Sequence, residues 1–390
     1  MKKSIVIITN GTLPVPPVNG GAVENLLQTF IDSNEKYKNF ELVVFSIFNK
    51  SAYEKSKSYK LSKFIFINSN TISYKYERFC RYLLNRLSGN KFKNQFIKKV
   101  LKFKKEFVST DIILVENNPF FIPQIKKITS KQIGLHLHND YLNIDKRQFS
   151  NSVLKKTDFV IAVSKYIKNR ISEIAPANIK LDVVYNGINL DRFSSFKKIK
   201  KNNEIVILFS GRLQQGKGVK LLIEVFLDLL KNNINNIRLI IIGGSGFVNG
   251  KKTLFIDEIE TLSKRSNGKI NFVGYIDYNK IHEYYNQADL AVFPSIETEA
   301  FGLTTLEALA SGLPVIVSDA GGMHEVINDK CGFVVNRGDN MKMELKETLL
   351  KLIIDNNLRS SMSQEAKIQA KNFTDIKFYR SIVKTLNNIQ

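Results

Sequence analysis

The sequence predicts an α/β protein of two domains, and three features lead to this expectation. A chain of 390 residues is too long for one ordinary hydrophobic core. Its content of hydrophobic residues, 43%, is enough to fill two cores. Short apolar runs typical of buried strands alternate with segments of helical periodicity, so that strand–helix–strand order recurs. We therefore expect two α/β domains of fewer than about 200 residues each.

The first domain begins with a strand, a glycine loop and a helix. Residues 4–9 are a continuous apolar run, and a proline-stiffened loop then leads through Gly20 and Gly21 to a helix near Ala22. This order indicates a Rossmann-like start. The dinucleotide fingerprint Gly-x-Gly-x-x-Gly is absent, which disfavours a classical dinucleotide site. A plain surface turn remains an alternative for this loop.

Two histidines stand at the end of a later strand. Residues 111–116 and 132–140 are predicted buried strands, and the second carries His136 and His138. Ligands of open α/β sheets bind at the carboxyl ends of strands, so His138 is better placed than His136, which lies inside the strand. Either histidine could be the functional one.

The segment 74–107 is rich in lysine, and its apolar residues recur at helical spacing. They are Phe79, Leu83, Leu87, Phe92, Phe96, Val100, Phe103 and Phe107. One interpretation is a set of amphipathic helices that dock on an anionic membrane. The other is that the apolar residues pack on the sheet while the lysines face water.

The net charge of +22 is concentrated in the first half of the chain. Residues 1–200 hold 35 Lys and Arg against 15 Asp and Glu, whereas residues 201–390 hold 23 against 21. This asymmetry suggests an anionic partner surface, either lipid headgroups or nucleic acid. A composition biased throughout toward Lys, Asn and Ile is the alternative explanation. No basic-aromatic RNA motif or helix-turn-helix pattern supports nucleic acid, so we expect none as partner.

The expected compartment is the cytoplasm. No apolar stretch approaches the ~18 residues of a membrane span, and the first residues lead into a strand instead of a signal peptide. Cys80 and Cys331 have no metal-ligand spacing and suit a reducing compartment. The basic first half adds the expectation of peripheral association with the inner face of the plasma membrane.

The second domain begins after a lysine-rich linker at 194–203. A strand at 205–210 leads into a glycine-rich turn with two cations, Arg212 and Lys217, before the next helix. Arginine can bind a diphosphate through its fork and lysine as a point charge. The spacing is not that of a Walker loop. Ordinary exposed loop charges are the alternative.

The stretch from Glu299 to Glu307 joins a buried strand at 290–293 to a helix that begins near Leu303. Backbone N–H groups at Phe301, Gly302 and Leu303 would lie at the helix start, where the dipole favours an anion. Carboxylates beside a phosphate accept hydrogen bonds from neutral groups such as sugar hydroxyls, so the expected ligand is a nucleotide-sugar. Two solvated charges at a helix start are the alternative.

Three segments resemble those of retaining glycosyltransferases of family 4, which have the GT-B fold: the Glu299–Glu307 stretch, the Arg212–Lys217 turn and the loop at Gly20. Bacterial enzymes of this type commonly build surface glycans. The resemblance implies two Rossmann-like domains that face each other across a cleft. The first would span 1–195 on the acceptor side, and the second 196–372 on the nucleotide-sugar side. A C-terminal helix at 373–390 would cross back onto the first domain.

The resemblance further implies a hexosyltransferase that moves a sugar, with retention, from a nucleotide-sugar to a cell-surface glycan or lipid-linked acceptor. A UDP-sugar is the first expected donor and GDP-mannose the next. Neither a cofactor nor a metal is expected, and the chain has no Asp-x-Asp motif. The implied catalytic residues are His138, Glu299, Arg212 and Lys217. The implied donor-binding residues are Gly20, Gly21, Arg212, Lys217, Tyr275, Ile276, Glu299, Phe301, Gly302, Leu303 and Glu307.

Two other functions fit the same fold. A nucleotide-sugar epimerase would need further acid–base groups near the sugar, and it would turn over its substrate without an acceptor. A catalytically silent relative could serve as a binding or coat protein. The presence of Glu299, Glu307, Arg212 and Lys217 argues against the silent relative.

Overall fold

The computed structural model describes residues 2–18, 20–69, 94–194, 204–246 and 252–389. The chain divides into two compact units. Unit 1 holds Met1–Val184 and Phe378–Gln390, and unit 2 holds Tyr185–Lys377. Most of the predicted linker lies outside the described residues, as do the predicted apolar positions Phe79, Leu83, Leu87 and Phe92.

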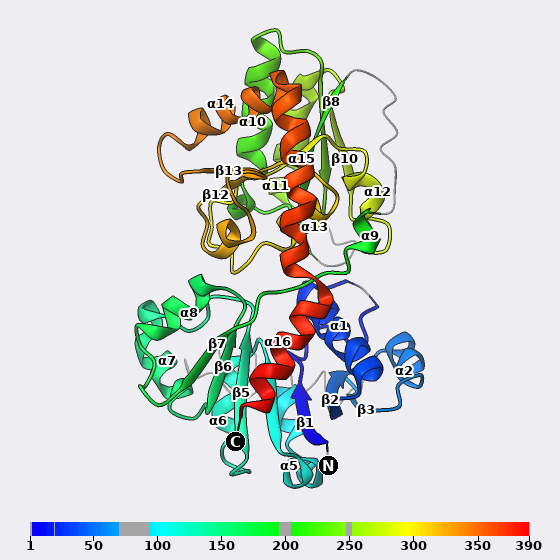
Figure 1. The fold of residues 1–390 in the computed structure, drawn as a ribbon, viewed down its shortest axis with the longest axis vertical. Helices are drawn as coiled ribbons and strands as arrows, with labels where there is room; N and C mark the ends of the chain where they lie inside the picture. The colour runs from blue at the N-terminus through cyan, green and yellow to red at the C-terminus, as the bar shows by residue number, and fades with distance from the viewer. Residues whose placement is uncertain (1, 19, 70–93, 195–203, 247–251, 390) are drawn as a thin grey trace. The chain divides into compact units, whose positions relative to one another are not determined.

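Unit 1 is built on a parallel sheet of seven strands in the order β3-β2-β1-β4-β5-β6-β7. Helices cover both faces of this sheet (Figure 1). The central strands are therefore buried on both sides, which explains their continuous apolar runs. The strands are β1 (Lys3–Ile8), β2 (Phe40–Ile47), β3 (Ser62–Ile67), β4 (Ile112–Glu116), β5 (Gln132–Leu137), β6 (Phe159–Ala162) and β7 (Lys180–Val183).

The helices of unit 1 bury apolar residues. In the first of them, Leu26, Leu27, Phe30 and Ile31 are buried, at the spacing of one helix face. The helices are α1 (Ala22–Tyr37), α2 (Lys50–Ser56), α4 (Gln95–Val100), α5 (Lys104–Ser109), α6 (Ile122–Ile125), α7 (Arg147–Leu154), α8 (Lys165–Ser172) and α16 (Asp375–Asn387), with 3-10 turns η1 (Pro119–Phe121) and η2 (Ile144–Lys146).

The described part of the lysine-rich segment packs mainly inward. Phe96, Val100 and Phe107 are buried, and the ring of Phe107 stacks on Phe45 of β2. Only Phe103 among these predicted positions is exposed, at 39%. The Phe103 ring nevertheless packs edge-on against Phe45, with ring centroids 5.5 Å apart. The described apolar residues of this segment therefore pack mainly inward, as one of the two interpretations expected.

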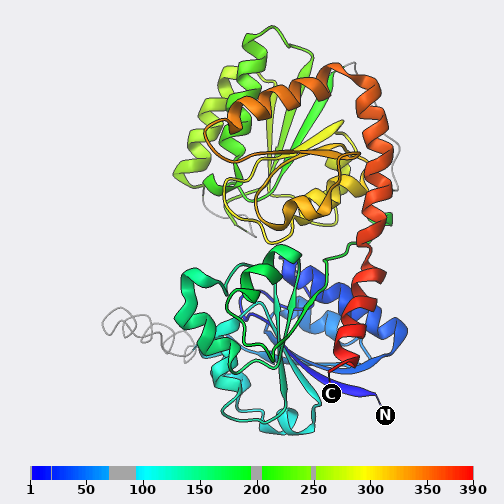
Figure 2. The same ribbon diagram turned by 60° about the vertical axis from the view of Figure 1, so that its left-hand side comes forward.

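Helix α16 comes from the far end of the sequence and packs on α1. The Tyr379 ring stacks on Tyr37 with ring centroids 5.5 Å apart, and its hydroxyl donates to Oδ1 of Asn39 at 2.7 Å. At the end of the helix, Lys3 Nζ from β1 donates to the carbonyl oxygens of Leu386, Asn387 and Ile389. A cation at this end also complements the helix dipole. The last helix is thus part of unit 1 (Figure 2).

Unit 2 has a parallel sheet of six strands in the order β10-β9-β8-β11-β12-β13, again between helices. Its core includes the large buried side chains of Phe209 and Phe226. The strands are β8 (Ile205–Ser210), β9 (Ile237–Ile242), β10 (Ile270–Gly274), β11 (Leu290–Phe293), β12 (Val315–Ser318) and β13 (Gly332–Val335).

The helices of unit 2 leave the carboxyl ends of the strands to loops. They are α9 (Asp191–Ser194), α10 (Val219–Lys231), α11 (Leu254–Ser263), α12 (His282–Tyr285), α13 (Leu303–Ala310), α14 (Met341–Ile354) and α15 (Asn356–Ala370). The 3-10 turns are η3 (Gln215–Lys217), η4 (Lys264–Ser266), η5 (Gly322–Val326) and η6 (Lys371–Phe373). No helix in the described ranges is long and apolar enough to cross a membrane.

Candidate functional site

The loop before α13 brings Glu299 and Lys217 into one ion pair. Lys217 Nζ donates to Oε1 of Glu299, and Ser295 Oγ donates to the same oxygen at 2.8 Å. The backbone of Glu299 is also fixed, because its carbonyl accepts from the N–H of Gly322 at 2.7 Å. The Glu299 carboxylate therefore lies in a defined place although its side chain is 19% exposed.

The turn that carries the two predicted cations is fastened to this loop. The carbonyl oxygen of Gly216 accepts from the N–H groups of Ile296 and Glu297, at 2.8 and 3.0 Å. Lys217 ends the short turn η3, while Arg212 is an exposed residue just after β8. The turn after β8 and the loop after β11 therefore form one continuous edge at the carboxyl ends of adjacent strands.

Helix α13 begins at a glycine in the left-handed region. Gly302 has φ 101° and precedes Leu303, the first residue of the helix. A side chain at Gly302 would also meet Met323, so glycine is required here on two counts. The preceding Phe301 is buried against Tyr185 and Phe373, with ring centroids 6.0 and 5.8 Å away. This packing fixes the direction in which the helix start points.

Glu307 lies in the second turn of α13 and is buried, contrary to the alternative of a solvated charge. Burial raises the pKa of its carboxyl to about 7, against the opposing effects of the Tyr285 hydroxyl and of Arg192. The Tyr285 hydroxyl donates to Oε2 of Glu307 at 2.9 Å. The guanidinium of Arg192 lies 4.6 Å from the Tyr278 ring centroid and donates to Asn279 at 2.9 Å. Glu307 is thus an acidic group that can gain or lose its proton near neutral pH.

Tyr275 and Ile276 follow the edge strand β10 and are partly buried. Tyr275 lies beside the end of β9, where the N–H of Gly243 donates to the carbonyl of Gly274 at 2.9 Å. The structure places these two residues, like Arg212 and Lys217, at the carboxyl ends of the strands of this sheet.

The glycine loop of unit 1 packs against a buried carboxyl group. Gly21, with φ 107°, precedes the first residue of α1, and a side chain there would collide with the carboxyl of Glu24. Glu24 is 4% exposed and accepts from Nδ2 of Asn10 at 3.2 Å. Burial raises the pKa of Glu24 to about 7. The glycine pair therefore leaves room for an acid that the sequence did not single out.

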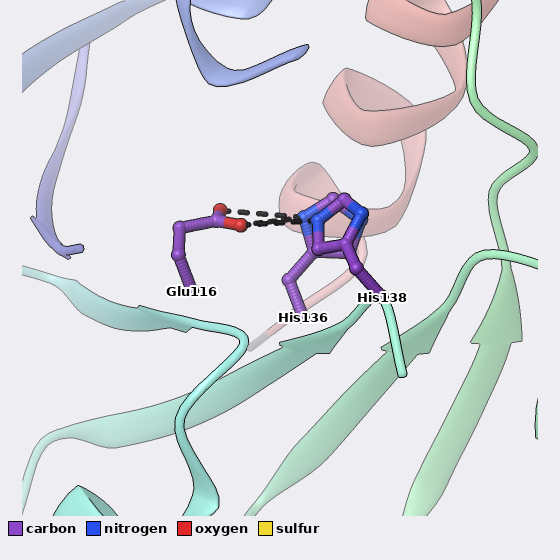
Figure 3. Close-up of side chains that lie close together, drawn as sticks. All are labelled: Glu116, His136 and His138. Atoms are coloured by element: carbon purple, nitrogen blue, oxygen red, sulfur yellow. Dashed lines mark hydrogen bonds and ion pairs between the residues drawn. The ribbon is translucent and has the colours of Figure 1, made fainter. Parts of the chain in front are cut away.

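Both predicted histidines meet at a third buried carboxyl group, Glu116, at the end of β4 (Figure 3). Oε2 of Glu116 lies 3.1 Å from Nδ1 of His136 and 3.4 Å from Nε2 of His138. The two histidines lie on one face of the sheet, because residues two apart along an extended segment share a face. Their rings lie 4.1 Å apart between centroids.

The protonation of this cluster follows from its contacts. Burial opposes charge on Glu116, but the interactions with His136 and His138 outweigh it and lower the pKa to about 2. Burial and the neighbouring His136 lower the pKa of His138 to about 4. Glu116 is thus an anion at neutral pH and His138 is neutral.

The cluster has the donor set of a metal site, so its fit to a metal ion can be examined. The nitrogen–oxygen distances of 3.1 and 3.4 Å are near the edge of a zinc tetrahedron, about 3.4 Å for bonds of about 2.1 Å. A metal-bound histidine carries a proton on its other nitrogen and normally donates it. Among the described residues, however, Nε2 of His136 and Nδ1 of His138 have no hydrogen-bond partner. Hydrogen bonds from the histidines to Glu116 therefore fit the surroundings better than a metal.

The fold and the family are decided by comparison with known proteins. The structure of Anabaena HepE, determined in complex with UDP and glucose, superimposes with a TM-score of 0.75 over 98% of this chain and 99% of that one, at 18% identity. The family model described as Glycosyltransferase Family 4 matches residues 57–192, and the one described as Glycosyl transferases group 1 matches residues 191–369. The chain belongs to the GT-B glycosyltransferases. The predictions of the fold, the family and a glycosyltransferase activity are confirmed.

Curated relatives of this glycosyltransferase span most of its length. An uncharacterized glycosyltransferase of Methanocaldococcus jannaschii is 28% identical over 79% of this chain and 74% of its own. Spore coat protein SA of Bacillus subtilis is 24% identical over 94% of both chains. The capsular polysaccharide biosynthesis glycosyltransferase CapM of Staphylococcus aureus is 29% identical over 55% of this chain and 57% of its own.

Several side chains that contact the predicted residues of each unit had no signal in the sequence. Tyr285 and Arg192 are distant from Glu307 along the chain, and nothing local marks them as its neighbours. Glu24 lies three residues after Gly21, and Glu116 ends a predicted strand, so their positions were visible but their partners were not. Glu116 could be paired with His136 only once β4 was known to lie beside β5.

Proposed function

We propose that this glycosyltransferase transfers a hexosyl group from a UDP-sugar to a cell-surface glycan or lipid-linked acceptor, with retention and without a metal ion. GDP-mannose is the next donor to consider. The donor is supported by the UDP and glucose bound in the HepE structure, and the acceptor by the name of the relative CapM. The observation that carries the proposal in this chain is the buried pair of Glu307 and Tyr285 in unit 2.

Glu307 is suited to bind the ribose of the nucleotide. Tyr285 occupies Oε2 of the carboxyl group, and we assign Oε1 to a ribose hydroxyl. A hydroxyl that donates to a carboxylate favours its ionised form. Nucleotide binding should therefore lower the raised pKa of Glu307.

The diphosphate is assigned to Arg212, Lys217 and the N–H groups at Phe301, Gly302 and Leu303. As the bond to the sugar breaks, negative charge develops on the leaving diphosphate, and preorganised cations and N–H groups stabilise it. Lys217 is paired with Glu299 in this structure. A diphosphate would attract Lys217, which leaves Glu299 to accept hydrogen bonds from hydroxyls of the transferred sugar.

The remaining roles rest on the family resemblance. Tyr275 and Ile276 would contact the base, and Gly20 and Gly21 the diphosphate. His138 would contact the transferred sugar. No protein nucleophile is assigned, since no residue is singled out for that role.

Thermal stabilisation by nucleotide-sugars tests this proposal. UDP-, GDP- and ADP-sugars are added with EDTA or with Mg²⁺ to the wild type and to Glu307→Gln and Arg212→Ala. We expect a UDP-sugar to raise the melting temperature equally with EDTA and Mg²⁺, and both variants to lose most of this shift. Arg265→Ala, which alters a basic residue of η4, is the matched control and should keep the shift. No shift with any nucleotide-sugar would overturn the donor site, and a shift that needs Mg²⁺ would overturn metal independence.

Peripheral association with the inner face of the plasma membrane is the second part of the proposal. The described surface around α4 and α5 carries five lysines with the exposed apolar residues Phe103 and Val108. These lysines are Lys98, Lys99, Lys102, Lys104 and Lys105. Such a surface suits anionic lipid headgroups. We expect co-sedimentation with vesicles that contain phosphatidylglycerol but not with purely phosphatidylcholine vesicles, and Lys102→Glu with Phe103→Ser should weaken it. Equal binding to both vesicles would contradict this part.

A further inference from the structure

Glu116 holds the two histidines in one arrangement through two neighbouring strands. Glu116 of β4 and His136 of β5 are direct partners in the parallel sheet, and His138 follows the end of β5 on the same face. The backbone is fixed as well. The N–H of Asn117 donates to the carbonyl of His136 at 2.8 Å, and Oδ1 of Asn117 accepts from the N–H of His138 at 3.0 Å. The ring of His138 is therefore positioned by two contacts, one from its backbone N–H to Asn117 and one from its Nε2 to Glu116.

The hydrogen of the His138 ring must lie on Nε2. An ionised carboxylate can only accept hydrogen bonds, so the nitrogen that faces Glu116 has to carry a hydrogen. Nε2 is the nitrogen that faces Oε2 of Glu116, at 3.4 Å (Figure 3). A neutral imidazole has one N–H only, so its Nδ1 then has a free lone pair. The low pKa of His138 agrees with a neutral ring at physiological pH.

The Nδ1 atom of His138 is buried and has no hydrogen-bond partner in the described part of the protein. A buried polar atom without a partner is unusual and calls for an explanation. A bare ring nitrogen accepts a hydrogen bond from a hydroxyl group. The diphosphate of a nucleotide-sugar is a diester with no proton to donate at neutral pH, and the buried charge of Glu116 would repel it. The chemistry of this atom therefore selects a hydroxyl group.

We propose that Glu116 is a positioning residue that holds His138 in its Nε2–H tautomer, so that Nδ1 accepts a hydrogen bond from a hydroxyl of the transferred sugar. This inference rests on the proposed function for the identity of the ligand, but the tautomer does not depend on it. It assigns the acceptor role to His138 and leaves His136 as the neighbour that shares the Glu116 carboxylate.

Nuclear magnetic resonance of labelled histidine tests the tautomer directly, because the chain has only four histidines. Two-bond nitrogen–proton correlations distinguish Nε2–H from Nδ1–H, and single histidine substitutions assign the signals. We expect a neutral Nε2–H ring at His138 in the wild type. In Glu116→Gln the amide can donate to Nε2, so a substantial fraction of Nδ1–H should appear. Glu41→Gln, the same change at an exposed strand position of unit 1, should leave the spectrum unchanged. A wild-type ring in the Nδ1–H form, or an unchanged ring in Glu116→Gln, overturns the proposal.

Binding of UDP and of the UDP-sugar, measured separately by calorimetry, tests the role of the acceptor. Glu116→Gln should weaken the UDP-sugar roughly 5- to 10-fold, the value of one hydrogen bond, and leave UDP unchanged. Two substitutions of His138 distinguish a hydrogen bond at Nδ1 from a merely structural role, because they place an oxygen at different ring positions. In His138→Asn the amide oxygen replaces Nδ1 and should keep most of the affinity for the sugar, whereas His138→Gln places its oxygen near Nε2 and should lose it.

The double variant Glu116→Gln with His138→Asn completes the test. Because asparagine needs no partner to keep its oxygen an acceptor, Glu116→Gln should have no further effect on sugar affinity in this background. A loss in both backgrounds would mean that Glu116 acts on the fold and not through His138. If the wild type binds neither UDP nor a UDP-sugar, the proposed function fails, and the tautomer in Glu116→Gln still decides the role of Glu116.

Discussion

Glu116 in unit 1 and Glu307 in unit 2 are both buried carboxyl groups, yet their pKa values move in opposite directions. The pKa of Glu116 falls to about 2 and that of Glu307 rises to about 7. Burial favours the neutral form in both cases. Glu116 faces two imidazole rings, whereas Glu307 has one hydroxyl donor and a more remote guanidinium. The comparison teaches that the number and charge of the partners, not the depth of burial, decide whether such an acid is ionised.

The strongest test of this comparison removes the partners of Glu116. His136→Leu with His138→Leu leaves a buried carboxylate unpaired, which should lower the free energy of unfolding of unit 1 by roughly 3–5 kcal/mol at pH 7. Hydrogen exchange of the amides of β4 and β5 measures this loss. Adding Glu116→Leu removes the charge as well and should recover most of the stability. If the triple variant is as unstable as the double, packing and not charge explains the effect.

The pH dependence of stability should have opposite signs at the two sites. The pKa of Glu307 is higher in the folded than in the unfolded chain, so its stabilisation is complete below about pH 4.5 and is lost as the pH rises through about 7. The loss in unit 2 is on the order of 3 kcal/mol. Glu116 has the reverse shift, so its stabilisation is lost as the pH falls from about 4.5 toward 2.

Denaturant unfolding from pH 5 to pH 8, followed by hydrogen exchange in α13, measures the effect of Glu307. Glu307→Gln should flatten the profile in unit 2. The pKa of Glu24 is raised in the same way, so the stability of unit 1 should also fall as the pH rises over this range. Glu24→Gln should remove that fall. An unchanged slope in Glu307→Gln would show that Glu307 is ionised throughout.

Removal of the Tyr285 hydroxyl, which donates to Glu307, should have a smaller effect. Tyr285→Phe deletes the hydroxyl that donates at 2.9 Å and should cost about 1 kcal/mol of unfolding free energy. Because this bond favours the ionised form, the pKa of Glu307 should rise further. The carboxyl stretching band of Glu307 in the infrared spectrum, followed against pH, reports the shift. Tyr284→Phe, in the same helix, is the control and should leave the band in place.

The smallest expected effect on stability is at the partly exposed ion pair. Lys217→Gln breaks the bond to Glu299 and should change the unfolding free energy by less than about 1 kcal/mol. It should nevertheless weaken UDP by tenfold or more, since the diphosphate loses a cation. Lys220→Gln, which breaks an exposed pair with Glu258 in the same unit, should match the change in stability without affecting UDP. Equal UDP affinity in both variants would remove Lys217 from the donor site.

Local elements could be predicted from the sequence because their signals are local. The apolar run at 290–293 and the helix from Leu303 coincide with β11 and α13. The strand predicted over 132–140 ends earlier, at Leu137, because the N–H of His138 donates to the side chain of Asn117 instead of to a neighbouring strand. Such a side-chain bond between distant residues leaves no trace in periodicity.

The electrostatic character of the site could be predicted less well than its residues. Glu307 was expected beside a phosphate-binding helix start, but its burial and its bond to Tyr285 depend on the packing of α12 and α13. The convergence of Glu116, His136 and His138 depends on the strand order, which places β4 next to β5. Sequence spacing indicates which residues share a strand face, whereas the pKa values of those residues depend on contacts across the sheet.

Helix α16 has a consequence for the order in which the protein is made. A ribosome completes residues 185–377, and hence all of unit 2, before it adds residues 378–390, which belong to unit 1. Until then the nascent chain lacks Tyr379 against α1, and Lys3 lacks the three carbonyl oxygens at the helix end. Unit 1 therefore begins the chain but can complete its packing only after residues 378–390 have been made. In the meantime Phe30 of α1 also lacks the Tyr379 ring, whose centroid lies 5.6 Å from its own.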